Sequence, residues 1–146
     1  MCWQPEYEML PREQLEALQL ERLQATLAQA GKSPYYGGTF AKLGIKPQDL
    51  THISQIRDLP FTTKEDLRGN YPYGFLTVPR DELVRLHCSS GTTGNPTEIF
   101  HNRHDLASWA NLVARSLYAA GARPHHVFQN ICGYGLFTGE IGRAHV

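Results

Sequence analysis

Residues 89–97 combine the side-chain types that proteins use to hold phosphate groups. The segment reads SSGTTGNPT, with five hydroxyl side chains and two glycines in nine residues. Glycines let backbone N–H groups approach a ligand closely, and hydroxyls add hydrogen-bond donors that need no fixed charge. The same residue types are common in polar hairpin turns, so composition alone leaves both interpretations open. The segment is not a Walker loop, because the GxxxxGK[ST] pattern is absent.

A second glycine-rich segment, residues 132–139, reads CGYGLFTG. Its glycines would let a ligand approach the backbone closely. From the residues alone, Tyr134 and Phe137 are more readily interpreted as aromatic side chains of a core.

Histidine and cysteine side chains could supply soft metal ligands if the fold brought them together. They occur in three pairs: His87 with Cys88, His101 with His104, and His125 with His126. Solvated or packed histidines are the commoner case, so we expect no metal site. The odd number of cysteines, without any CxxC spacing, argues against a disulfide framework and a zinc ribbon and indicates a reducing compartment.

Length and charge narrow the class of protein. The chain has 146 residues, with 14 Lys and Arg against 14 Asp and Glu, so its formal net charge is zero. This balance argues against a general polyanion binder, and we expect no nucleic-acid partner. The apolar stretches fall far short of the roughly 20 residues that a spanning helix needs, and no basic segment followed by an apolar one begins the chain. We therefore expect one soluble, cytoplasmic domain with no membrane partner.

The first half of the chain has a helical pattern. A helix is expected from Pro11 to Ala30, where Gly31 ends it, and it carries an apolar stripe of Leu20, Leu23, Leu27 and Ala30. Residues 33–38 have turn composition, and a short helix is expected over 39–43. A further short helix is expected within 49–59. Thr62 or Thr63 then caps a helix that ends by residue 70.

Strand patterns enter in the second half. Residues 83–88 and 97–101 are expected to be strands, on either side of the hydroxyl-rich segment. Asn102 is expected to cap a helix that Gly121 ends, with an apolar stripe of Leu106, Trp109, Ala110, Val113, Leu117 and Ala120. Residues 127–131 are expected to form a short buried strand. Strands that alternate with a helix, after a helical N-terminal region, indicate an α/β fold.

The pattern SSGTTGxPT resembles the phosphate-binding signature of the adenylate-forming superfamily, which includes acyl-CoA synthetases, luciferases and adenylation domains. Four further segments are similar to the phenylacetate-CoA ligase family within it: LPFTTKEDL at 59–67, RLH at 85–87, the helix around 105–121, and GYGLFTG at 133–139. The resemblance covers about residues 3–139. It implies the α/β start of the large N-terminal, AMP-binding domain of such an enzyme.

The resemblance implies ATP-dependent ligation of an aryl acid, phenylacetate, to coenzyme A. The carboxylate would attack the α-phosphate of ATP, and CoA would then displace AMP from the acyl-adenylate, with Mg²⁺ neutralising the phosphates. Carried over position by position, the phosphate ligands are Ser89, Ser90, Gly91, Thr92, Thr93, Gly94, Asn95 and Thr97, and the substrate wall is Tyr134, Gly135 and Phe137. Asn95 stands where many members have lysine, which removes a point charge but leaves the backbone donors. The resemblance also allows a homodimer of the full-length protein.

The last seven residues, 140–146, depart from the family. They read EIGRAHV, which is also one translation of a widely used sequencing adapter, so we expect a non-native read-through tail after a truncated domain at 1–139. Such a fragment would lack the parts needed for catalysis, and its catalytic residues are unknown. Two alternatives stay open: an adenylyltransferase of the same superfamily without a CoA step, and a small non-catalytic protein that binds phosphate-bearing ligands.

Overall fold

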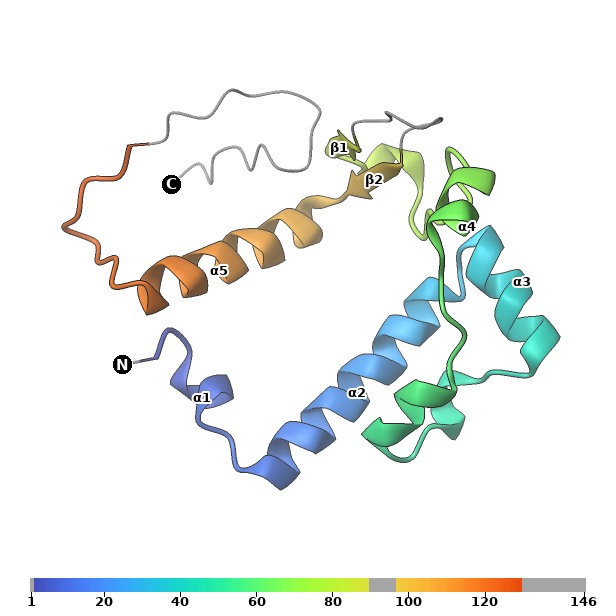
Figure 1. The fold of residues 1–146 in the computed structure, drawn as a ribbon, viewed down its shortest axis with the longest axis horizontal. Helices are drawn as coiled ribbons and strands as arrows, with labels where there is room; N and C mark the ends of the chain where they lie inside the picture. The colour runs from blue at the N-terminus through green and yellow to red at the C-terminus, as the bar shows by residue number, and fades with distance from the viewer. Residues whose placement is uncertain (1, 90–96, 130–146) are drawn as a thin grey trace. The chain divides into compact units, whose positions relative to one another are not determined.

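The computed structural model describes residues 2–89 and 97–129 of the chain. The chain divides into two compact units, one formed by residues 10–79 and the other by residues 1–9 together with 80–146 (Figure 1). The first unit is helical and the second contains the strands, so the mixed α/β character predicted from the sequence is confirmed.

Helix α2 (Arg12–Ala30) is the longest element of the helical unit. Leu27 is buried with Phe40 and Leu50, and the other three members of the predicted stripe pack against this cluster. The helix begins at Arg12, one residue after the predicted start, with Pro11 as its N-cap, and it ends before Gly31, as predicted. Side chains also fix the loops around it, since Gln24 donates from Nε2 to the Leu50 carbonyl oxygen at 2.7 Å.

The turn predicted over residues 33–38 is wrong, because α3 (Pro34–Leu43) already begins there. Ser33 caps this helix through its hydroxyl, which accepts the N–H of Tyr36 at 3.2 Å, and Pro34 occupies the first turn. A Cβ atom on Gly37 would lie 2.8 Å from the carbonyl oxygen of Gly31. A glycine is therefore required where α3 passes this closely over the end of α2. Gly44, at φ 67°, ends the helix in the left-handed region.

Short elements connect the rest of the helical unit. The helix expected within 49–59 is a 3₁₀ helix, Ile53–Asp58, and a second 3₁₀ helix, Pro47–Asp49, precedes it. Helix α4 (Lys64–Gly69) begins at Thr63, as predicted, with a reciprocal capping box to Asp66. The Thr63 backbone N–H and hydroxyl donate to this carboxylate and hold the pKa of Asp66 below its ordinary value.

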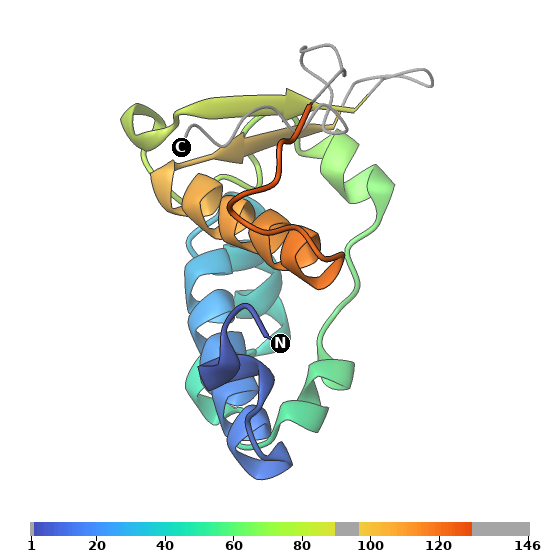
Figure 2. The same cartoon turned by 90° about the vertical axis from the view of Figure 1, so that its left-hand side faces the viewer.

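The second unit is built on a β-hairpin and a helix. After a 3₁₀ turn at Arg80–Glu82, strands β1 (Arg85–Cys88) and β2 (Glu98–His101) pair antiparallel, and they lie side by side in Figure 2. Both lie within the strands predicted from the sequence. Helix α5 (Arg103–Ala119) follows at once and ends before Gly121, which has a φ of 97°. The apolar stripe is right for Leu106, Trp109, Ala110 and Val113, which are partly buried, but wrong for Leu117 and Ala120, which are exposed.

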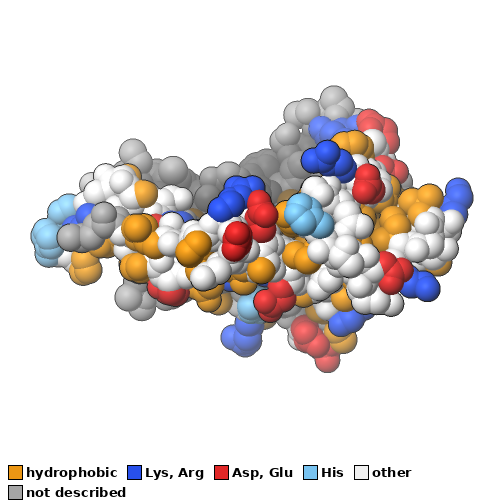
Figure 3. Space-filling model, turned by 90° about the horizontal axis from the view of Figure 1, so that it is seen from below, with side chains coloured by type: hydrophobic (Ala, Val, Ile, Leu, Met, Phe, Trp, Pro, Cys, Tyr) orange, Lys and Arg blue, Asp and Glu red, His pale blue; other side chains and the backbone are white. Residues whose placement is uncertain are grey.

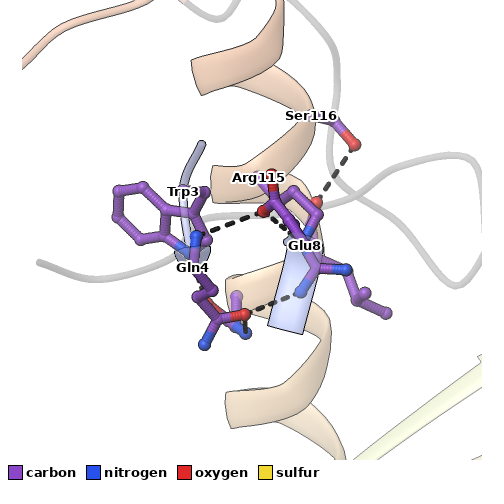
Figure 4. A network of polar contacts seen from close by, with 7 residues as sticks. Trp3, Gln4, Glu8, Arg115 and Ser116 are labelled. Atoms are coloured by element: carbon purple, nitrogen blue, oxygen red, sulfur yellow. Dashed lines mark hydrogen bonds and ion pairs between the residues drawn. The ribbon is translucent and has the colours of Figure 1, made fainter. Parts of the chain in front are cut away.

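The N-terminal segment belongs to this second unit and binds α5. It contains a single helical turn, α1 (Pro5–Glu8). Trp3 donates from Nε1 to Asn111 at 2.6 Å, and Arg115 donates to the Gln4 side chain at 2.7 Å (Figure 4). The Glu8 carboxylate lies 3.3 Å from Nε of Arg115. Polar contacts therefore tie the chain's beginning to a helix more than 100 residues later.

The buried strand expected at 127–131 is not formed in its described part. Residues 127–129 have no regular structure, and Val127 is 99% exposed. A strand needs a neighbour for its backbone hydrogen bonds, and within residues 2–89 and 97–129 the sheet contains only β1 and β2.

Asn102 is expected to stabilise α5 by about 1 kcal/mol, within a range of about 0.5–2. Its side chain accepts the Asp105 N–H at 2.9 Å, and the Asp105 carboxylate accepts the Asn102 N–H at 2.9 Å. Asn102→Ala should therefore raise the hydrogen-exchange rate of residues 103–119, read by mass spectrometry. Asn102→Asp is the control, because it keeps the acceptor and favours the helix dipole. Equal exchange in the alanine variant and the unmodified chain would contradict the assigned cap.

Candidate functional site

Ser89 and Thr97 pair across the base of the hydroxyl-rich segment, and this pair is called the neck below. The Ser89 N–H donates to the Thr97 carbonyl oxygen at 2.9 Å, and the Thr97 N–H donates to the Ser89 hydroxyl at 2.9 Å. The pair continues the register of β1 and β2, in which Cys88 faces Glu98. The ends of the segment are thus held one strand spacing apart. The Ser89 oxygen is used as an acceptor here, but its own hydrogen is still free to be donated.

The other predicted phosphate ligands lie between these two residues and outside the described part of the chain. They are Ser90, Gly91, Thr92, Thr93, Gly94 and Asn95. The predicted substrate-wall residues Tyr134, Gly135 and Phe137, and the tail at 140–146, also lie outside it. Their roles stay predictions.

One face of the hairpin packs on α5 through three rings. His87 and His101 project to the same face, because cross-strand partners share a face and side chains alternate along each strand. The indole of Trp109 contacts both imidazoles, with ring centroids 5.2 Å from His87 and 5.1 Å from His101. His87 is only 4% exposed. The position of the hairpin on the helix is therefore fixed by aromatic packing.

The opposite face of the hairpin carries Cys88. Burial, followed by the negative charge of Glu98 on the neighbouring strand, raises the pKa of the Cys88 thiol. A raised pKa lowers the fraction of thiolate, which is the nucleophilic form.

No group of three or more potential metal ligands occurs within residues 2–89 and 97–129. His87 packs against His101, a pairing that differs from the sequence neighbours considered above. Among the described helices, none has both the length and the apolar character needed to cross a bilayer. Acidic, basic and hydrophobic side chains are interspersed on the face seen in Figure 3.

The helical unit contains an open groove along α2 and α3, lined by residues including Gln24, Phe40 and Ile45. Its lining includes none of the residues predicted to bind phosphate or substrate. The chemistry suggested by the sequence is therefore concentrated at the hairpin, in the other unit.

Comparison with known proteins shows what the chain is similar to. The chain is 48% identical over 143 residues to the phenylacetate-coenzyme A ligase of Thermus thermophilus, which covers 97% of this chain. It is 47% identical to the Escherichia coli enzyme of the same name over 89% of this chain, and 50% identical to that of Pseudomonas putida over 85%. The chain is a relative of the phenylacetate-coenzyme A ligases. It spans only 28–32% of the length of these three relatives. No family model matches the chain.

Solved structures agree with this relationship. The chain superposes on 2-hydroxyisobutyryl-CoA ligase bound to 2-HIB-AMP and CoA in the thioesterification state with a TM-score of 0.71 and 31% identity. With the same enzyme in the postadenylation state the TM-score is 0.69 at 29% identity. Each match covers 79% of this chain and 25–26% of the other. The fold is therefore that of part of an adenylate-forming acyl-CoA ligase, as the resemblance predicted.

Proposed function

We propose that the chain is part of an enzyme that ligates phenylacetate, or a related aryl acid, to coenzyme A through an acyl-adenylate. The observation that carries this proposal is 43–50% identity to four phenylacetate-coenzyme A ligases, from Thermus thermophilus, Escherichia coli, Pseudomonas putida and Aromatoleum evansii. The structure supports it at the hairpin, where Ser89 and Thr97 hold together the ends of a segment with the superfamily's phosphate signature.

In this proposal the hairpin supplies donors to the phosphates of ATP. The backbone N–H groups beside Gly91 and Gly94, together with the hydroxyls of Thr92 and Thr93, would hold the β- and γ-phosphates while the carboxylate attacks the α-phosphate. Fixed donors stabilise the charge that moves between these groups and do not themselves exchange protons. Ser89 and Thr97 would position the segment and would not need to leave their own cross-strand hydrogen bonds.

The remaining parts of the reaction are assigned by the same proposal. Tyr134, Gly135 and Phe137 would line the aryl pocket. Mg²⁺ would neutralise the phosphates. We further propose that the enzyme is cytoplasmic. Residues 1–139 would be part of its AMP-binding domain, and residues 140–146 would be a non-native tail. A homodimer of the full-length protein stays a prediction.

A chimera tests the proposal directly. Residues 3–139 would replace the matching region of the Thermus thermophilus phenylacetate-coenzyme A ligase, and formation of phenylacetyl-CoA would be measured. We expect activity in the chimera, because 48% identity preserves the fold. A folded chimera without phenylacetate-dependent pyrophosphate exchange would contradict the proposal. Exchange without CoA ligation would instead indicate an adenylyltransferase.

Asn95→Lys in the chimera should lower KM for ATP by roughly 1.5- to 5-fold. A lysine at position 95 would add one charge toward the phosphates, and solvent-exposed charge pairs contribute about 0.2–1 kcal/mol. The gain should shrink between 0.05 and 0.5 M salt, because salt screens exposed charges. Asn95→Gln is the neutral control. A gain that does not depend on salt would show that charge is not its cause.

A further inference from the structure

The His87–His101–Trp109 cluster is the best-defined buried polar feature that the proposed reaction does not use. The imidazole centroids of His87 and His101 lie 5.2 Å apart with their planes at 71°. Both rings contact Trp109 on α5. Two ionisable side chains from neighbouring strands are thus enclosed between the hairpin and the helix.

Each imidazole has a nitrogen that lacks a partner. Nδ1 of His87 and Nε2 of His101 are buried, and neither has a hydrogen-bond partner in the described part of the chain. A neutral imidazole leaves only one uncharged nitrogen unpaired in this way, whereas an imidazolium would place an unpaired charged donor beside a second histidine. The enclosure therefore favours the neutral form of His101 over its protonated form.

Charged and titratable groups from β1 and α5 face His101. Burial, followed by His87 on β1, lowers the pKa of His101; Arg85 on β1 lowers it further, and Asp105 on α5 opposes the shift. The Asp105 carboxylate already accepts the Asn102 N–H at 2.9 Å. The Asp105 carboxylate is thus partly engaged elsewhere, and it does not offset the burial.

The hairpin connects the His87–His101–Trp109 cluster to the Ser89–Thr97 pair. His87 lies two residues before Ser89, and the His101 carbonyl accepts the Val84 N–H at 2.9 Å at the other end of the strands. The same short ladder ends in the Ser89–Thr97 pair. A change that lifts the histidine face from Trp109 therefore removes packing that supports a hairpin with only four residues in each strand.

We propose that His87 and His101 are positioning residues that form a proton-sensitive latch: their packing on Trp109 holds the hairpin on α5, and protonation of His101 releases it and loosens the Ser89–Thr97 neck. The effect of a loosened neck on ATP binding rests on the proposed function. Release of the hairpin itself does not depend on that function. Above about pH 6.5, the ordinary pKa of histidine, the latch is fully formed. As the pH falls below that value, a ring freed in the open hairpin binds a proton more readily than the enclosed ring. Opening becomes easier until the pH passes the lowered pKa.

Hydrogen exchange of the 146-residue chain tests the latch. Protection factors, corrected for the intrinsic pH dependence of exchange, would be measured by mass spectrometry for peptides covering 84–89 and 97–101. We expect them to fall by up to about 30-fold between pH 7.5 and pH 5 if one histidine is responsible. Helix α2, which contains no histidine, is the internal control and should change little.

Two variants and one direct measurement separate the outcomes. His101→Gln, which cannot be charged, should reduce the pH-dependent loss, whereas His104→Gln, at an exposed position on α5, should not. The exchange rate of the imidazole C2 hydrogen in the unmodified chain gives the pKa of His101 even if the glutamine variant fails to fold. A pKa at or above 6.5, or an equal loss of protection in a folded His101→Gln variant, would overturn the proposal.

Discussion

Replacing Thr92 and Thr93 together by valine in the active chimera is expected to lower kcat/KM for ATP about 10²- to 10⁴-fold. Valine keeps the β-branched shape and nearly the same volume but removes two hydroxyl donors. Each hydrogen bond to a charged group is worth roughly 1.5–3 kcal/mol, and every 1.36 kcal/mol is a factor of ten in rate. Phenylacetate-dependent exchange of pyrophosphate into ATP measures the adenylation step alone.

The matched control is the double serine variant, which keeps both hydroxyls while losing two methyl groups. It should stay within a few fold of the parent chimera. Stability should hardly change in the valine variant, because the substitution leaves the cross-strand bonds of Ser89 and Thr97 in place. Near-parental exchange with valine at both positions would show that the threonines serve only the turn, and the assignment of the loop as a phosphate site would then be wrong.

Helix ends were predictable from the sequence because capping is local. Asn102 is found at the start of α5 and Thr63 at the start of α4, and Gly31 follows the end of α2. In both caps the side chain reaches an N–H only three residues ahead. The decisive contacts therefore lie within one turn, where the order of residues alone determines them.

The segment at 33–38 shows where local reasoning went wrong. Its two glycines and its proline are turn residues, yet Ser33–Pro34 is also a sound start for a helix, with a hydroxyl cap and a proline in the first turn. Whether this segment forms a turn or a helix depends on Gly37, which lets α3 approach the Gly31 carbonyl closely. Glycine inside a helix costs about 1 kcal/mol relative to alanine, so the packing of α3 must offset it. That packing is not visible in the order of residues.

Part of the candidate site was likewise predictable from the sequence, and part was not. The two strands and the hydroxyl-rich segment between them were predicted, because strand periodicity and turn composition are local. The contact between His87 and His101 was missed, because it depends on the register of Arg85 opposite His101 and on Trp109 from a later helix. Alternation within each predicted strand could place both histidines on one face only once that register was known.

Phe40→Ala is expected to unfold much of the helical unit. Phe40 is 7% exposed and packs with Leu27 and Leu50, the other two buried hydrophobic residues in the described part of the chain. Its ring also contacts Tyr36, with centroids 5.4 Å apart. Phenylalanine-to-alanine changes in cores cost about 3–5 kcal/mol. A unit of this size has a total stability of roughly 4–10 kcal/mol, so the loss is comparable to the whole.

Phe61→Ala is the matched control within the same unit, because Phe61 is 93% exposed and its truncation removes no buried surface. Hydrogen exchange of α2 and α3 in the 146-residue chain measures both variants, and exchange should become fast with Phe40→Ala and stay slow with Phe61→Ala. The hairpin peptides serve as a second reference, since they belong to the other unit. Slow exchange of α2 in the Phe40 variant would mean that this small cluster does not support the unit, and that the partly buried leucines of α2 hold it without Phe40.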